Sequence, residues 1–193
     1  MITTLTLNHA LKEWSVAVDA LVEGKTIVLL RKGGIREERG KFSVDFDRAI
    51  LYPTYEHQQP DLLKPEYTDL VTPVESGWHP ERVSIPGWAE ITHIWKISER
   101  STVASLLPYH IWNERFVSER FNWKPKQPLY VLLLRAYRFE SVCDIAYRDE
   151  YGGCRSWLEI DETLDVDTQH PAIGDTEYQE QVDRIQYLIA ESV

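Results

Sequence analysis

Apolar and polar residues follow different periods along this chain, and each period predicts a different element. The segment 129–139 begins with an unbroken apolar run, which is typical of a strand buried on both faces. Residues 88–97 alternate between apolar and polar, as a half-buried strand does. We therefore expect a central strand at Leu129–Phe139 and a half-covered strand at 88–97.

Two stretches show the helical period instead. Apolar residues recur every three or four positions in 8–23, where Gly24 supplies a stop, and again from Asp175 to about 190. Ser101 is placed to cap a short helix, and Pro108 suits the first turn of another helix that reaches Phe121.

The remaining elements are short. Strand-sized apolar or alternating runs occupy 26–30, 42–46, 49–52 and 156–160. Because helices and strands alternate irregularly, the sequence predicts an α+β fold with a mixed or barrel-like sheet, packed by the N-terminal and C-terminal helices. Residues 53–87 hold six prolines and no helical period, so they form either a functional loop or short extended pieces.

Length and composition indicate one folded domain spanning residues 1–193. The chain is 43% hydrophobic and 27% charged, which is ordinary globular usage. No stretch approaches the roughly 20 apolar residues that cross a bilayer, and the first residues carry no basic region of a secretory signal. We expect a cytoplasmic protein without membrane contact, in which Cys143 and Cys154 are free thiols.

The net charge of −10 is unevenly distributed. Residues 1–138 carry 18 Lys and Arg against 17 Asp and Glu, whereas residues 139–193 carry 3 against 14. The segment from about 139 onward should repel a phosphate backbone. We expect it to form a separate acidic face, solvated or docking a basic protein partner, while a local basic site in the first 138 residues remains open to an anion.

Several classes of site are absent from the sequence. It contains no phosphate-binding P-loop, no His-Glu-x-x-His and no Gly-x-Ser-x-Gly. The one Glu-x-Lys, at 23–25, ends a predicted helix and has no acidic partner, which argues against a restriction-type nuclease. We predict no metal site, no cofactor and no identifiable catalytic residue.

Two polar segments each follow a predicted core strand. The basic turn 31–41 contains Lys32, Gly33, Gly34 and Arg36, whose backbone N–H groups and cations suit an anion. The loop 53–59 presents Tyr55, His57 and Gln58, which suit a planar group. A solvated hairpin and a polar surface loop are the structural alternatives. If both loops open at one end of the sheet, these residues surround one concave binding site.

A third segment, 109–126, interleaves aromatic and basic residues. Such interleaving can stack bases and neutralise phosphates, but a helix with core aromatics and solvated cations explains it as well.

Four segments together carry a family resemblance. They are 10–14 (Ala-Leu-Lys-Glu-Trp), 29–37 (Leu-Leu-Arg-Lys-Gly-Gly-Ile-Arg-Glu), 53–58 (Pro-Thr-Tyr-Glu-His-Gln) and 154–157 (Cys-Arg-Ser-Trp). The chain resembles the uncharacterised prokaryotic family known as domain of unknown function 1802. Relatives joined to a restriction-endonuclease catalytic domain imply a role in restriction or defence.

The predicted order of elements is also similar to that of PUA-like domains, which include the ASCH and EVE groups. That likeness implies a small barrel with an early helix. Gly24-Lys25-Thr26 is similar to the start of ASCH domains, but the Glu-x-Arg expected next is missing. No catalytic residue is therefore carried over.

The sequence is compatible with three functions. The chain is a PUA-like module that binds a nucleobase or modified nucleotide, or a module whose acidic segment docks a basic protein. The third is a small-molecule hydrolase with Glu37, Glu56 or His57 as general base, which lacks an identified nucleophile.

Overall fold

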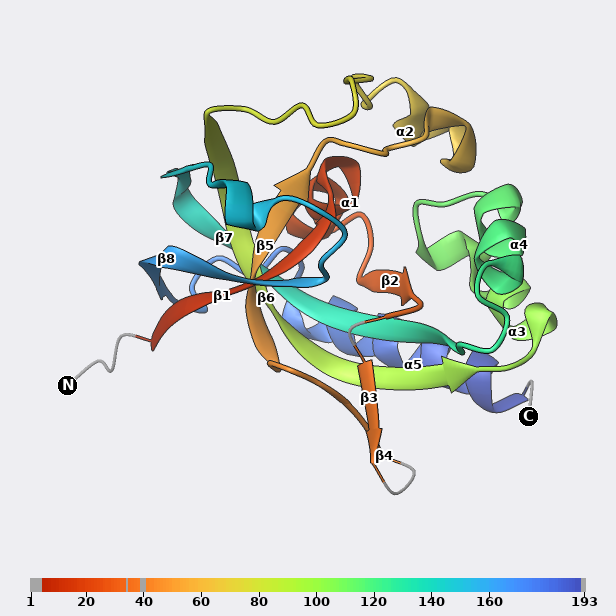
Figure 1. Cartoon of the computed structure of the whole chain (residues 1–193). Helices are drawn as coiled ribbons and strands as arrows, with labels where there is room; N and C mark the ends of the chain where they lie inside the picture. Colours follow the sequence, from red (N-terminus) through yellow and green to blue (C-terminus); the bar gives the residue numbers. More distant parts are fainter. Residues whose placement is uncertain (1–4, 34, 39–40, 192–193) are drawn as a thin grey trace.

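The computed structural model describes residues 5–33, 35–38 and 41–191, and within them six strands form one mixed sheet in the order β2-β7-β6-β5-β1-β8 (Figure 1). The strands of this sheet are β1 Leu5–Trp14, β2 Val28–Arg31, β5 Arg48–Thr54, β6 Arg82–Ile97, β7 Leu129–Ala146 and β8 Trp157–Val166. A hairpin of β3 Ile35–Glu38 and β4 Lys41–Val44 stands apart from it. Strands β1 and β5 run parallel, and the other neighbours are antiparallel.

Helices and short helical turns connect and cover the strands. The α-helices are α1 Ser15–Val22, α2 Pro65–Thr68, α3 Arg100–Ser105, α4 Glu114–Asn122 and α5 Asp175–Glu191. Single 3-10 turns occupy Pro60–Leu62, Leu107–Tyr109 and Asp149–Tyr151. No helix of the described segments is both long and apolar enough to cross a membrane.

The predicted α+β architecture is confirmed at its centre. Strand β7 lies between β2 and β6, and its residues from Leu129 to Tyr137 are all buried. Helices α1 and α5 contribute apolar side chains to the same core cluster as β7. Figure 1 shows α5 running along the sheet beside β6 and β7. The continuous apolar run therefore became the buried strand that its pattern predicted.

The first predicted helix, 8–23, is wrong over its first half. Residues 5–14 form β1, and the helix begins only at Ser15. Ala10 and Leu11 pair with Ile50 and Leu51 of β5 on one side and with β8 on the other. Both edges of β1 are thus hydrogen-bonded, and this tertiary pairing outweighs an apolar spacing that also fits a helix.

The helix predicted from Pro108 to Phe121 is divided. The 3-10 turn at Leu107–Tyr109 ends before His110, and α4 begins after Asn113, whose side chain accepts a hydrogen bond from the backbone N–H of Phe116 at 3.1 Å. An asparagine N-cap starts a new helix at this point.

The sheet curves strongly enough to bring distant strands together. Strands β2 and β1 are separated by three strands in the sheet order. Even so, the guanidinium of Arg31 at the end of β2 donates to the backbone carbonyl of Lys12 in β1 at 3.3 Å. This curvature gives the sheet the barrel-like form that the sequence predicted.

Candidate functional site

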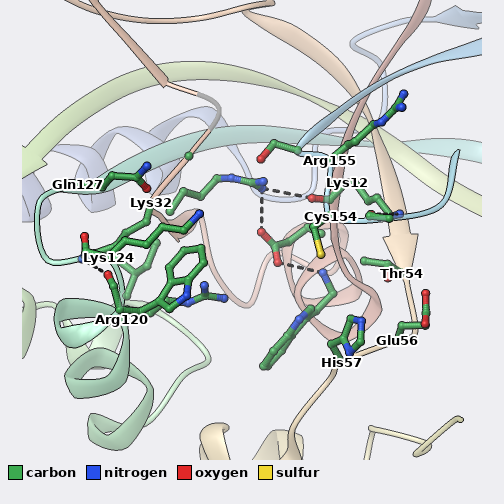
Figure 2. A pocket seen from close by; sticks show the side chains of 18 residues that line it. Lys12, Lys32, Thr54, Glu56, His57, Arg120, Lys124, Gln127, Cys154 and Arg155 are labelled. Atoms are coloured by element: carbon green, nitrogen blue, oxygen red, sulfur yellow. Dashed lines mark hydrogen bonds and ion pairs between the residues drawn. The ribbon is translucent and has the colours of Figure 1, made fainter. Parts of the chain in front are cut away.

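A cavity of about 460 Å³ lies where the ends of several elements converge (Figure 2). Strands β1, β2 and β5, helix α4 and the loop before β8 each supply part of its wall. The lining residues are Lys12, Glu13, Trp14, Leu30, Arg31, Lys32, Gly33, Thr54, Glu56, His57, Arg120, Trp123, Lys124, Gln127, Gly153, Cys154, Arg155 and Ser156. The volume falls in the range typical of small-molecule sites. We call this space the basic cavity.

Positive charge dominates this lining. The described residues around the basic cavity contribute six Lys and Arg side chains but only two carboxylates, those of Glu13 and Glu56. The whole chain has a net charge of −10. A local excess of cations inside an acidic protein makes the basic cavity a candidate site for an anion.

Three of the six cations hold the structure together. The Lys12 ammonium donates to the carbonyls of Tyr151 at 2.7 Å and Gly153 at 3.0 Å, which fastens the loop before β8. Arg31 forms an ion pair with Glu13 at 2.9 Å, and both side chains are largely buried.

Lys32 is the third structural cation. Its ammonium donates to the carbonyls of Phe121 at 3.1 Å, Trp123 at 2.6 Å and Lys124 at 3.3 Å. These carbonyls lie at the C-terminal end of α4, where backbone acceptors lack partners within the helix. Lys32 therefore ties the end of β2 to the end of α4.

The other three cations have their polar groups available. Among the described residues, Arg120, Lys124 and Arg155 have no hydrogen bond or ion pair through their side chains. The Arg120 guanidinium stacks between the rings of Phe116 at 4.8 Å and Trp123 at 5.5 Å, and the Lys124 ammonium lies 4.4 Å from the Trp123 centroid. Figure 2 shows Arg120 and Lys124 on the side of the basic cavity opposite Lys12, Thr54, Glu56 and His57.

Burial and mutual repulsion disfavour the charged forms of several of these cations. Burial lowers the pKa of Lys12, although Glu56 and Cys154 oppose the decrease. Burial and then the charge of Arg120 lower the pKa of Lys32. Burial also lowers the pKa of Arg120, with Glu13 opposing and Arg31 adding to the decrease. A bound anion would favour the charged form of Arg120, whose guanidinium has no hydrogen-bond acceptor among the described residues.

Backbone strain is concentrated at the same place. Among the described residues, the non-glycine residues with positive φ are His57, at 61°, and Lys124, at 46°. Both line the basic cavity, from opposite sides. Such conformations cost free energy and are found preferentially at functional sites.

The structure brings together some of the residues predicted from sequence. Lys32, Gly33 and His57 line the basic cavity. Gly34 lies outside the described residues, as does the side chain of Glu37.

The other predicted residues lie elsewhere. Arg36 is on the β3–β4 hairpin, which projects away from the sheet (Figure 1), and its guanidinium pairs with Asp45 at 2.7 Å. The Gln58 side chain is buried and accepts hydrogen bonds from the Ser15 hydroxyl and the Val16 N–H, both at 3.1 Å, so it caps α1. Tyr55 packs edge-on against Trp78 in a neighbouring hollow.

Sequence reasoning missed most of the remaining cations. Lys12 falls within the predicted helix 8–23, which by itself gave no sign of a binding site. Arg155 falls within the segment that was expected to form a separate acidic face. That expectation needs correction, because residues 153–156 line the basic cavity. The signals that pointed here were the interleaved segment 109–126, which contains Arg120, Trp123 and Lys124, and the family-resemblance segments 10–14 and 154–157, which contain Lys12 and Arg155.

Within the segments that the structure describes, no group of three or more His, Cys, Asp and Glu side chains is arranged to hold a metal ion.

Comparison with known proteins gives one family. Residues 10–184 match the family described as "Domain of unknown function (DUF1802)". Each of the four segments that carry the family resemblance in the sequence contributes to the lining of the basic cavity. No curated protein matches the chain in sequence.

Similar folds occur among solved structures. An ASCH protein from Zymomonas mobilis is 15% identical, with 91% of this chain and 93% of that chain covered and a TM-score of 0.46. Two single-residue variants of that protein give TM-scores of 0.45 and 0.43, at 15% and 14% identity, with 91% of this chain and 96% and 94% of theirs covered. At this level of similarity no activity passes from those proteins to this chain.

Proposed function

The chain belongs to the DUF1802 family, and from its own geometry we propose that the basic cavity binds a nucleotide. The observation that carries the proposal is an accessible aromatic ring beside cations whose N–H groups make no hydrogen bond or ion pair among the described residues. Trp123 is 48% exposed, and the Arg120 and Lys124 side chains contact its ring through cation–π interactions. Phosphate would contact the cations, while a base would stack on an aromatic face.

The polar groups of the lining fit the same ligand. Gln127, Thr54 and Ser156 carry amide and hydroxyl groups that can donate to and accept from the edge of a base. The concave shape and the acidity of residues 139–193 favour a single nucleotide unit over the broad face of a duplex. A modified nucleotide, and a role in restriction or defence, stay predictions that rest on the family resemblance.

Hydrolysis has weaker support than binding. A hydrolase needs a nucleophile within hydrogen-bond reach of a base. Among the described residues, neither the His57 ring nor the Cys154 thiol makes a hydrogen bond. The acidic protein-docking alternative rests on a separate hollow along α5, where Glu177, Glu180 and Asp183 lie beside Tyr109 and Tyr187.

Titration of the protein with nucleoside monophosphates and with the matching nucleosides tests the proposal. Lys124→Gln and Arg155→Gln should each weaken binding of the monophosphate by about three- to tenfold and leave the nucleoside nearly unchanged. Trp123→Ala should weaken both ligands by about tenfold, because stacking on an aromatic ring is lost for each of them.

Arg184→Gln is the matched control, since it removes one positive charge from α5, away from the basic cavity. Equal losses in Arg184→Gln and Arg155→Gln would mean that only overall charge matters. Absence of monophosphate binding to the wild-type chain would reject the proposal.

A further inference from the structure

A second, smaller hollow adjoins the basic cavity. The two share Lys12, Thr54 and Glu56 as lining residues, so they meet at the end of β5. The wall of the second hollow is aromatic, with Tyr55, Trp78 and Tyr147 among its residues. Its volume of about 20 Å³ has room for roughly one water molecule, so a ring bound here would stack on the outside of this wall.

Trp78 supplies the accessible surface of that wall. Its side chain is 45% exposed, although a tryptophan ring usually buries most of its area. Tyr55 meets it edge-on, with ring centroids 5.8 Å apart and planes at 89°. This contact steadies the Trp78 ring from the side.

The turn that carries Trp78 is held against the basic cavity. The backbone N–H of Trp78 donates to the backbone carbonyl of Glu75 at 3.1 Å, which closes the turn. The Glu56 carboxylate accepts a hydrogen bond from the backbone N–H of Gly77. Next to Trp78, the ring of His79 stacks on Tyr147 with centroids 3.4 Å apart. The exposed indole therefore stands on a segment that is fastened to Glu56, a residue that lines both spaces.

The two most exposed tryptophans of the described residues thus line two adjoining spaces, Trp123 the basic cavity and Trp78 the second hollow. Lys124 lies on one side of the basic cavity, and Thr54 and Glu56 lie on the other (Figure 2). The Trp123 ring is 4.4 Å from the Lys124 ammonium, and Trp78 lines the second hollow together with Thr54 and Glu56. Aromatic platforms separated by positive charge are how proteins hold successive bases of a single strand without sequence readout.

We propose that the site binds a single-stranded segment of at least two nucleotides, an inference that rests on the proposed function. One base would stack on Trp123 and another on Trp78, and the phosphate that connects them would contact the cations of the basic cavity. A free mononucleotide fills only the Trp123 end. Trp78 is then a length-determining residue, and its contribution appears only when the ligand extends past Thr54 and Glu56.

The test is a length series measured by fluorescence anisotropy or calorimetry. It uses 5′-phosphorylated homopolymers of one to eight nucleotides, in ribose and deoxyribose forms, with the full chain. Affinity should rise by tenfold or more between one nucleotide and a short oligomer and then level off. The two sugar series identify which backbone is preferred.

Trp78→Ala should lower affinity for the oligomers by about tenfold and leave the mononucleotide unchanged, and Trp78→Phe should restore most of the loss. Retained mononucleotide binding shows that the variant is folded. Tyr187→Ala, which removes another exposed aromatic from α5, should change neither.

The outcomes separate the two proposals. Mononucleotide binding with no dependence on length, or a Trp78→Ala variant equal to wild type on every oligomer, overturns this inference and leaves the proposed function standing. Failure of all ligands to bind overturns both.

Discussion

Neighbouring cations of the basic cavity have different roles, and the difference lies in their hydrogen bonds. Lys32 is buried, and its ammonium donates hydrogen bonds to three backbone carbonyls. Lys124 is exposed, and its ammonium lies over the Trp123 ring. An ammonium that already has three acceptors gains little from an added phosphate. The ligand contacts are therefore expected from Arg120, Lys124 and Arg155.

His110 gives a prediction at the scale of one residue. It is 2% exposed, and burial, with the charge of Lys64 adding, lowers its pKa to about 4 from the ordinary 6.5. Between these two values the unfolded chain binds a proton that the folded chain does not, so stability is complete above pH 6.5 and is lost as the pH falls toward 4. His110→Leu removes this titration.

Urea denaturation at pH 7 and pH 5 measures the effect. The wild-type chain should lose about 2 kcal/mol more free energy of unfolding between these pH values than His110→Leu does. Equal losses in both proteins would show that His110 is not held neutral in the folded state.

At the scale of elements, the site depends on the junction between β2 and α4. Helix α4 ends at Asn122, and the following residues Trp123 and Lys124 turn into the basic cavity. Their carbonyls are held by Lys32 alone among the side-chain donors of the described residues. The position of the stacking ring therefore follows from a contact made by a different element.

Lys32→Met should disturb this junction. Loss of a charged donor to three carbonyls should lower the free energy of unfolding by about 1–3 kcal/mol, as measured in urea. Nucleotide affinity should fall as well, because Trp123 and Lys124 lose their support. Lys126→Met, an exposed cation of the same loop, is the control; equal stability of the two variants would argue against the capping role.

At the scale of the whole molecule, the net negative charge belongs to residues 139–193, although ion pairs such as Arg48–Glu90 and Arg148–Asp161 mix the two signs across the fold. Residues 139–193 carry 3 Lys and Arg against 14 Asp and Glu, yet Arg155 from this segment lies in the basic cavity. Exposed charges interact weakly beyond about 10 Å at 0.1 M salt, so the distant carboxylates have a small effect on the ligand.

Neutralising two distant carboxylates tests whether they affect binding at the basic cavity. Asp165→Asn with Glu180→Gln alters β8 and α5 outside the basic cavity. Oligonucleotide affinity should hold or rise by about threefold at most, and the change should disappear at higher salt. A clear loss of affinity at unchanged stability would place these carboxylates in the binding site.

The sequence by itself determined the elements whose signal is local. The apolar run at 129–139 and the helical period from Asp175 predicted β7 and α5, because burial on both faces or along one stripe is visible in neighbouring residues. It also pointed to three residues of the basic cavity, Lys32, Gly33 and His57, through the turns that follow core strands.

Only the tertiary structure decided the rest. Residues 5–14 became a strand because β5 and β8 pair with both its edges, and those partners come from distant parts of the chain. The same holds for the roles of polar side chains. Lys32 bonds to carbonyls 89 to 92 residues away, and Gln58 caps a helix about 42 residues before it. Hydrogen-bond partners at such separations leave no local pattern, so the fold alone assigned these two side chains to structure and left Arg120, Lys124 and Arg155 available for a ligand.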